Sequence, residues 1–441
     1  MEHTYFHSVT LDREKCMGCI NCIKRCPTEA IRVRHGKAKI IKERCIDCGE
    51  CIRVCPYHAK KAVTDPFSRI DDFIYKVALP APSLYGQFNH INDINIILNG
   101  LKQIGFDDVY EVARGAELVT IATLDLMYQN RLVMPVISSA CPAVVRLIRV
   151  RFPSLISHLL PVMSPMEVAG GLARREAMEK TGLPAHKIGV FFISPCAAKM
   201  TVIKEPLGQE RSNIDGAIAM SDIYMKLAPI ISKIEPKENL VRAGKKGVGW
   251  ANRGGEAVAI GKDEYISVDG IDNVIKVLEE LEDEQLTNIK FVEAGACTGG
   301  CVGGPLAVEN GFVAETRINL LTKRLTSYEM EQAFPAIDLE DVSWSKPVEY
   351  MPVMKLDDDM REAMQKMERM ERIADSLPKL DCGSCGAPSC RALAEDIVRG
   401  FGHEMDCIYK LRDRVHNLAK EMVDLEENLM AFRQEESEHG Q

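Results

Sequence analysis

The chain has 441 residues, of which 46% are hydrophobic, and its formal net charge is −9. This length predicts about three domains with sizeable cores, and an acidic balance without a basic block argues against nucleic acid as a partner. Residues 1–15 are polar and contain no signal-peptide core, and no apolar run is long enough for a membrane span. We expect a cytoplasmic protein, because its cysteines must stay reduced.

The sixteen cysteines divide into four groups of four, with none left over. A cuboidal iron–sulfur cluster takes four thiolates, so the count predicts four [4Fe-4S] clusters. A disulfide scaffold is the alternative, which the size and cytosolic character of the chain disfavour. The groups are two N-terminal runs (Cys16, Cys19, Cys22, Cys26 and Cys45, Cys48, Cys51, Cys55), a scattered set (Cys141, Cys196, Cys297, Cys301) and a C-terminal set (Cys382, Cys385, Cys390, Cys407).

Both N-terminal runs have the spacing C-x2-C-x2-C-x3-C-P, which is typical of bacterial two-cluster ferredoxins. In that pattern the fourth cysteine of each run binds the cluster of the other run, so Cys55 completes the first cluster and Cys26 the second. Zinc ribbons are the alternative, but zinc sites normally offer paired C-x2-C knuckles. We expect residues 1–72 to form a ferredoxin-like α+β domain through which electrons pass.

The middle of the chain contains four short apolar runs, each of which ends in a turn of small residues. Helix-like stretches separate the runs, and one of them begins with the capping-box sequence Ser164-Pro165-Met166-Glu167. Alternating strands and helices predict an α/β architecture with ligands beyond the C-terminal strand ends. A single cysteine is more often a small buried apolar residue, but four at equivalent positions predict one shared site. The runs are 75–79, 132–137, 188–193 and 289–292.

Three segments of this region resemble the signature motifs of [FeFe]-hydrogenases. The family motifs T-S-C-C-P, M-P-C-x-x-K-x-x-E and E-x-M-A-C-x-x-x-C-x-x-G-G-G correspond here to S-S-A-C-P at 138–142, S-P-C-A-A-K at 194–199 and E-A-G-A-C-T-G-G-C-V-G-G at 293–304. The three motifs occur in the family's order. The resemblance implies a two-lobed α/β domain over residues 73–352.

The resemblance also implies what the scattered cysteines bind. Cys141, Cys196, Cys297 and Cys301 would hold a [4Fe-4S] cluster, and Cys301 would bridge it to a two-iron subsite with carbon monoxide, cyanide and an azadithiolate. Lys199 would donate a hydrogen bond to one cyanide, and Pro82 and Ser83 match the stretch that contacts the other. A surface lysine is the alternative for Lys199, which its apolar segment disfavours.

The proton relay of the family is missing. Catalytic members carry a cysteine where this chain has Ala140, and an alanine cannot carry a proton. We predict that Glu256 or Glu293 supplies a different route, and a salt bridge of Glu256 with Arg253 or Lys245 is the alternative. The family's relay carboxylates align with Thr123, Leu126 and Val202, its relay serine with Leu160, and two of its methionines with Ser194 and Gly295.

The C-terminal part predicts a helical iron–sulfur module over residues 353–407 and a coiled-coil helix over 408–441. The spacing C-x2-C-x4-C-x16-C resembles a small [4Fe-4S] module of corrinoid and regulatory proteins, with zinc as the alternative. A preceding methionine pattern predicts core packing (Met360, Met364, Met367, Met370). In the coiled-coil segment, apolar residues recur at alternating steps of three and four and form a seam along one side of the helix (Ile408, Leu411, Val415, Leu418, Met422, Leu425, Leu429, Phe432). This seam predicts a homodimer, parallel or antiparallel, and a single helix packed on its own protein is the alternative.

Together these features predict a low-turnover, H2-sensing [FeFe]-hydrogenase that interconverts H2 with protons and electrons and has an unidentified redox or signalling partner. A metabolic, ferredoxin-linked hydrogenase is one alternative, and the missing relay disfavours it. A non-catalytic, hydrogenase-like iron–sulfur protein is the other, and the presence of Ser83 and Lys199 disfavours it.

Overall fold

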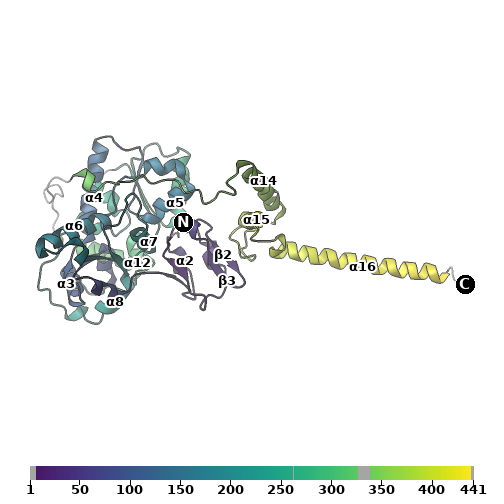
Figure 1. Ribbon diagram of the computed structural model, residues 1–441, viewed down its shortest axis with the longest axis horizontal. Helices are drawn as coiled ribbons and strands as arrows, with labels where there is room; N and C mark the ends of the chain where they lie inside the picture. The colour runs from purple at the N-terminus through teal and green to yellow at the C-terminus, as the bar shows by residue number, and fades with distance from the viewer. Residues whose placement is uncertain (1–5, 262, 326–337, 439–441) are drawn as a thin grey trace. The chain divides into compact units, whose positions relative to one another are not determined.

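The computed structural model describes residues 6–261, 263–325 and 338–438, with side chains as far as residue 430, and it contains two compact units (Figure 1). Unit 1 comprises Met1–Glu14 and Lys42–Val353, and unit 2 comprises Lys15–Ile41 and Met354–Gln441. The predicted mixed α/β fold is confirmed, while the predicted domain boundaries stay predictions. Among the described residues no helix combines the length and the apolar character that crossing a bilayer requires.

One lobe of unit 1 is built on a four-stranded parallel sheet in the order β6-β5-β8-β9. All seven residues of β8 are buried, which is expected for a parallel strand covered on both faces. Helices of this lobe include α3 (Ile94–Gln103), α6 (Pro165–Thr181) and α8 (Met220–Leu227). The strands are β5 (Tyr75–Pro80), β6 (Asp108–Val109), β8 (Ile188–Ser194) and β9 (Gly216–Ala219).

The other lobe has a three-stranded parallel sheet in the order β10-β11-β7. The apolar run 132–137 yields only a two-residue strand, β7 (Val136–Ile137), because only these two residues pair with β11. Helices α5 (Pro142–Arg151) and α11 (Ile271–Glu282) share a buried core with β11. The remaining strands are β10 (Tyr265–Asp269) and β11 (Phe291–Gly295).

The helix predicted at the capping-box sequence begins where expected, with Pro165 as its first residue, but the capping box itself is wrong. The Ser164 hydroxyl has no hydrogen-bond partner among the described residues. The Glu167 carboxylate accepts hydrogen bonds from the Ser212 hydroxyl and the Asn213 amide, both at 2.7 Å, so it does not turn back to its own helix start.

The rest of unit 1 consists of short elements that connect or flank the two sheets. Strands β1 and β4 form a separate antiparallel pair, and α4 packs on α6. These elements are β1 (Val9–Leu11), α2 (Glu50–Arg53), β4 (Lys60–Ala62), α4 (Val112–Tyr128), α7 (Ala197–Lys204), α9 (Lys245–Gly249), α10 (Gly255–Ile260) and α12 (Gly311–Thr322).

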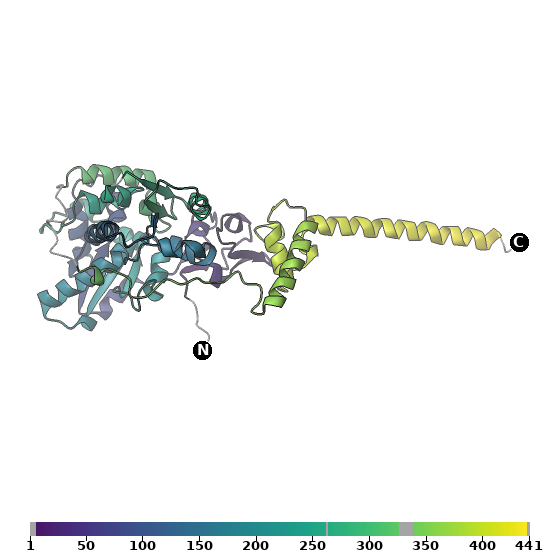
Figure 2. The ribbon, with the colours of Figure 1, turned by 90° about the horizontal axis from the view of Figure 1, so that it is seen from above.

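Unit 2 joins an N-terminal hairpin to the C-terminal helices. Its last helix, α16 (Ile408–Glu438), is one uninterrupted rod in both ribbon views (Figures 1 and 2). The prediction that the methionines of α14 pack in a core holds only for Met370, which is 5% exposed, because Met360, Met364 and Met367 are exposed. The other elements are α1 (Asn21–Lys24), β2 (Ile31–Arg34), β3 (Lys37–Ile40), α14 (Met360–Ser376) and α15 (Cys390–Val398).

Candidate active site

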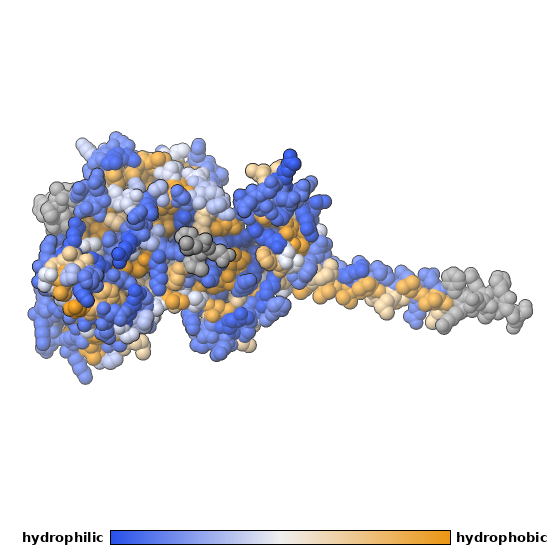
Figure 3. Space-filling view, viewed as in Figure 1, coloured by the Kyte–Doolittle hydropathy of each residue, from blue (hydrophilic) through white to orange (hydrophobic). Residues whose placement is uncertain are grey.

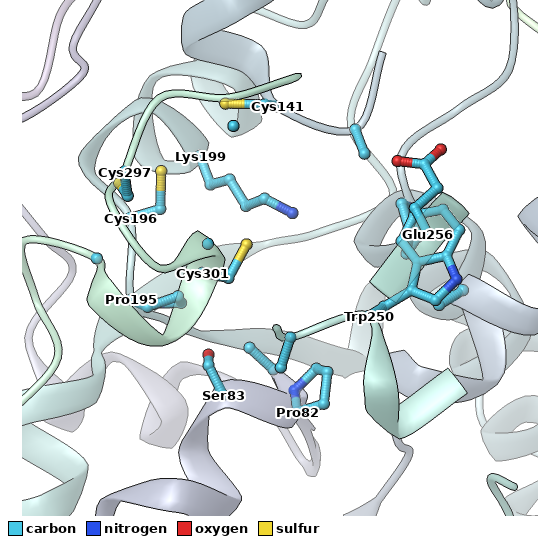
Figure 4. Close-up of a pocket in the computed structure, with 18 of the residues that line it drawn as sticks. Pro82, Ser83, Cys141, Pro195, Cys196, Lys199, Trp250, Glu256, Cys297 and Cys301 are labelled. Carbon is cyan, nitrogen blue, oxygen red and sulfur yellow. The ribbon is translucent and has the colours of Figure 1, made fainter. Parts of the chain in front are cut away.

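The C-terminal strand ends of both sheets in unit 1 contribute to one cavity of about 120 Å³ (Figure 4). The turn after β5 and the turn after β8 approach it from one lobe, and the turns after β7 and β11 approach it from the other. The predicted site residues of the middle region all line this cavity, and they are Pro82, Ser83, Ala140, Cys141, Cys196, Lys199, Glu256, Glu293, Cys297 and Cys301.

The local backbone explains how the cysteines reach the cavity. Cys141 and Cys196 are the last extended residues before α5 and α7, so each side chain leaves the chain at the junction of a turn and a helix. Cys301 follows Gly299 and Gly300, whose φ angles of 84° and 80° favour glycine. A Cβ atom on Gly300 would lie 2.9 Å from the Arg253 amide nitrogen, so this close approach of two loops also requires glycine.

Burial dominates the electrostatics of the thiols in the cavity. It raises the pKa of Cys196 to about 12, and the neighbouring Cys141 adds to the effect. Burial likewise raises the pKa of Cys297 and Cys301, and the Lys199 ammonium opposes it at Cys301. Four converging thiols are the donor set that a [4Fe-4S] cluster requires, so the residues present fit such a group.

The polar side chains of Ser83 and Lys199 line the cavity. Ser83 is fully buried, and its hydroxyl has no hydrogen-bond partner among the described residues. The Lys199 ammonium extends between the cysteines and Glu256 (Figure 4) and lies 5.5 Å from the centroid of the Phe192 ring. A buried donor without a partner is costly, so the Ser83 hydroxyl suits a polar ligand, and the partly buried Lys199 ammonium supplies a positive charge for an anionic one.

Glu256 lies on the side of the cavity opposite the cysteines (Figure 4). Its Oε2 atom accepts a hydrogen bond of 2.6 Å from the Ser138 hydroxyl, and its Oε1 atom is buried with no partner among the described residues. Burial, and next the charge of Glu293, raise the pKa of Glu256 to about 8. Glu256 can therefore be neutral near pH 7 and can carry a proton.

Glu293 is held beside Glu256 by backbone amides. Its two carboxylate oxygens accept hydrogen bonds of 2.9 Å from Gly254 and Ala257. Burial raises the pKa of Glu293 to about 7, and these amides oppose the shift. The two carboxyls thus form a pair of proton-binding groups at one edge of the cavity.

The alternative salt bridge of Glu256 is not what the structure contains. Arg253 pairs with Asp269, at 3.6 Å, and Glu256 bonds to Ser138. Ser138 was not predicted from the sequence as a partner of Glu256, and no role was predicted for Trp250 and Asn252, which also line the cavity. The position of Ser138 in the same strand-end turn as Cys141 was the one signal that could have identified it.

The second N-terminal cysteine run is tied to the walls of this cavity within unit 1. Ile46 is buried in the core formed by α5 and β11, and a Cβ atom on Gly49 would lie 2.5 Å from the Pro305 ring. The Asp47 carboxylate is fully buried and accepts from the Arg146 guanidinium at 3.2 Å and the Thr201 hydroxyl at 2.8 Å. These contacts join the loop of Cys45, Cys48 and Cys51 to the helices that follow Cys141 and Cys196.

Backbone amides donate to several of the remaining sulfur atoms. The distances are 3.4 Å from Ala38 to Cys16, 3.2 Å from Ala30 to Cys26 and 3.3 Å from Ala59 to Cys55. Such hydrogen bonds tune the potential of a bound cluster. The exchange of Cys26 and Cys55 between the two clusters stays a prediction.

The C-terminal cysteines gather around the start of α15 in unit 2. Cys390 is the first residue of that helix, and Cys407 immediately precedes α16. Cys382 and Cys385 lie in the preceding loop, where the hydroxyl and amide of Ser384 lower the pKa of Cys382.

Comparisons with known proteins agree with this arrangement. Residues 75–263 and 252–305 match the family "Iron only hydrogenase large subunit, C-terminal domain". Residues 8–56 match "4Fe-4S dicluster domain", and residues 377–409 match "Putative Fe-S cluster". A variant of the [FeFe]-hydrogenase HydA1 from Chlamydomonas reinhardtii superposes with a TM-score of 0.50 at 14% identity, covering 63% of this chain and 95% of that one. This likeness concerns the fold alone.

Two curated relatives illustrate the range of similar proteins. Iron hydrogenase 1 of Clostridium pasteurianum is 24% identical over 368 residues, which is 67% of this chain and 64% of that protein. The cytosolic Fe-S cluster assembly factor nar1 of Aspergillus flavus is 23% identical over 163 residues, which is 36% of this chain and 28% of that protein. The chain therefore spans less than two thirds of either relative's length.

Proposed function

This chain belongs to the iron-only hydrogenase large-subunit family, whose C-terminal domain matches more than half of its 441 residues, and we propose that it interconverts H2 with protons and electrons at low turnover as an H2 sensor. The observation that carries the proposal is one cavity lined by four cysteines from two lobes, together with the Lys199 ammonium and the Ser83 hydroxyl, which has no hydrogen-bond partner in the described part of the chain.

Cys141, Cys196, Cys297 and Cys301 would hold the [4Fe-4S] part of an H-cluster, and Cys301 would link it to the two-iron subsite with its carbon monoxide, cyanide and azadithiolate ligands. When bound, this group supplies the metal chemistry that splits or forms H2. Lys199 and Ser83 would donate hydrogen bonds to anionic ligands of the group. Pro82 would shape the wall of the cavity beside Ser83.

The proton would travel through the two carboxyls of the cavity rather than through a thiol, because Ala140 occupies the thiol's place. Glu256 would take or give the proton through its free Oε1 atom, while the Ser138 hydroxyl keeps the carboxyl in place. Glu293 would be the next proton-binding group, since its charge already influences Glu256. Support for low turnover is the loss of the family's thiol from position 140.

Electrons would leave toward the C-terminal module, and contacts inside unit 2 support this route. The Lys24 ammonium, two residues after Cys22, donates to the carbonyl of Asp381, the residue before Cys382, and at 3.1 Å to that of Pro388, two residues before Cys390. The Arg34 guanidinium donates to the Cys385 carbonyl at 2.7 Å. The cysteine loops of the N-terminal hairpin and of the C-terminal module are thus directly connected.

A buried ion pair holds these loops together. The Arg32 guanidinium lies 2.8 Å from the Asp396 carboxylate on α15, and both side chains are less than a tenth exposed. A Cβ atom on Gly386 would collide with the Val33 carbonyl, so the backbones touch. We propose that reduction of the C-terminal cluster reports on H2, and that α16 or an unidentified redox or signalling partner docked nearby reads the change.

Two alternative functions predict different rates of H2 turnover. A metabolic, ferredoxin-linked hydrogenase would turn over fast. A non-catalytic iron–sulfur protein has some support in the similarity to an Fe-S cluster assembly factor, but the cavity and the free Ser83 hydroxyl favour a bound group.

Infrared spectroscopy of the full chain, after maturation with the two-iron complex, tests the proposal. Stretching bands of carbon monoxide and cyanide are expected, together with slow H2 turnover and H2-driven reduction of the cluster that disappears in Cys385→Ser. Absence of the bands would leave only the non-catalytic alternative, and fast turnover would favour the metabolic one.

A further inference from the structure

The apolar seam of α16 has no partner among the described residues. Residues 411–430 of the helix are all exposed, and the space-filling view shows a hydrophobic band along the rod (Figure 3). Phe432 belongs to the seam by sequence, but its side chain lies outside the described residues. The exposed fractions are 48% for Ile408, 47% for Leu411, 58% for Val415, 42% for Leu418, 70% for Met422, 62% for Leu425 and 63% for Leu429.

A helix of this kind needs a partner in water. Most helical stability in proteins comes from packing of the apolar face rather than from intrinsic propensity. Apolar residues occupy every a and d position from Ile408 to Leu429, which is the spacing of a coiled coil, and the exposed Val423 and Met430 widen the stripe at two b positions. We infer that α16 packs in antiparallel orientation against α16 of a second copy of this chain.

The charges beside the seam select the orientation. With Ile408, Val415, Met422 and Leu429 at the a positions, Arg412 and Glu426 are e residues, and Arg414 and Glu421 are g residues. In a parallel dimer in register, a g residue lies beside the e residue of the partner's next heptad, so Glu421 faces Glu426 on both flanks. Like charges there oppose pairing.

In an antiparallel dimer, residues of opposite charge lie beside each other on the flanks of the seam. When all seam residues pair, Leu418 lies opposite Met422 of the partner and Leu411 opposite Leu429. Residues at e then face residues at e, so Arg412 lies beside Glu426 of the second copy on both ends of the rod. A single like-charge contact remains, between the two Glu421 side chains near the dyad. The balance of charge favours the antiparallel dimer.

Glu426→Lys should weaken an antiparallel dimer but strengthen a parallel one. Glu426→Lys in the full chain places a lysine beside Arg412 in the antiparallel dimer, but beside Glu421 in the parallel one. We expect the dimer dissociation constant, measured by analytical ultracentrifugation at low salt, to rise roughly tenfold. Adding Arg412→Glu should restore the wild-type constant.

Glu427→Lys is the matched control, because it makes the same charge change at the next residue, off the seam, and should leave the constant unchanged. Leu418→Glu, which places a charge inside the seam, should give a monomer in the same ultracentrifugation experiment. A wild-type chain that is monomeric at all concentrations would overturn the dimer. An unchanged or lowered constant for Glu426→Lys would overturn the antiparallel orientation. None of these outcomes depends on whether the cavity acts on H2.

Discussion

Unit 1 contains two buried acidic sites that use the same kind of side chain in opposite ways. Asp47, under the second cysteine run, has a fully buried carboxylate that is matched by the Arg146 guanidinium at 3.2 Å, the Thr201 hydroxyl and the Val9 amide. Glu256, in the cavity, has the Ser138 hydroxyl on one oxygen and no partner on the other among the described residues. Both carboxyls are buried, so the number of hydrogen-bonding partners, and not burial, separates a structural charge from a proton carrier.

Replacing the cavity carboxyl should have the largest effect. Glu256→Gln keeps the shape and the bond to Ser138 but cannot exchange a proton, so H2 turnover should fall by about 10²–10⁴-fold. Infrared bands should stay as in the wild type, which shows that the group is loaded. Glu279→Gln, at an exposed pair with Arg151, is the control and should leave turnover unchanged. Equal turnover in Glu256→Gln and wild type would remove Glu256 from the route.

The matched carboxylate should instead affect stability. Asp47→Asn leaves the Arg146 guanidinium buried without its counter-charge, so the free energy of unfolding should fall by about 3–5 kcal/mol. Chemical denaturation of the full chain measures the loss, with iron content followed in parallel. Asp12→Asn, which breaks an exposed pair with Lys61 at 3.5 Å, should cost less than about 1 kcal/mol. Similar losses in both variants would contradict the structural role of Asp47.

The free energy of unfolding should depend on pH through the Glu256 carboxyl. The pKa of Glu256 is raised from 4.5 to about 8 on folding, so the folded chain binds this proton more tightly than the unfolded chain. Its contribution to stability is complete below pH 4.5 and is lost as the pH rises through 8. Relative to Glu256→Gln, the wild type should lose stability across this window. A difference that does not change with pH would contradict the raised pKa.

The smallest effect is expected at the residue that the sequence suggested as a salt-bridge partner of Glu256. Arg253 is 59% exposed and pairs with Asp269 at 3.6 Å, so Arg253→Gln should change the free energy of unfolding by less than about 1 kcal/mol. The pH profile of turnover should keep its wild-type form. A shifted profile would show that Arg253 acts on Glu256 after all.

The sequence could predict the architecture and the convergence of the cysteines, because strand ends of parallel sheets meet at one edge and the motifs mark those ends. It could not predict the bond between Ser138 and Glu256 or the ion pair of Asp47 with Arg146, since these depend on how two lobes pack. The capping box failed for a similar reason. Ser212 and Asn213, far along the chain, bind Glu167 more favourably than its own helix start does.

The division of the cavity between two sheets has a mechanical consequence. Cys196 belongs to the turn after β8, while Cys141, Cys297 and Cys301 follow strands of the other sheet. Iron bound by all four would cross-link the lobes, because its ligands would come from both sheets. Loss of that iron would remove the cross-link and leave side-chain packing such as that of Ala198 in the core of α5 and β11, so the stability of unit 1 should fall with the occupancy of the metal centre.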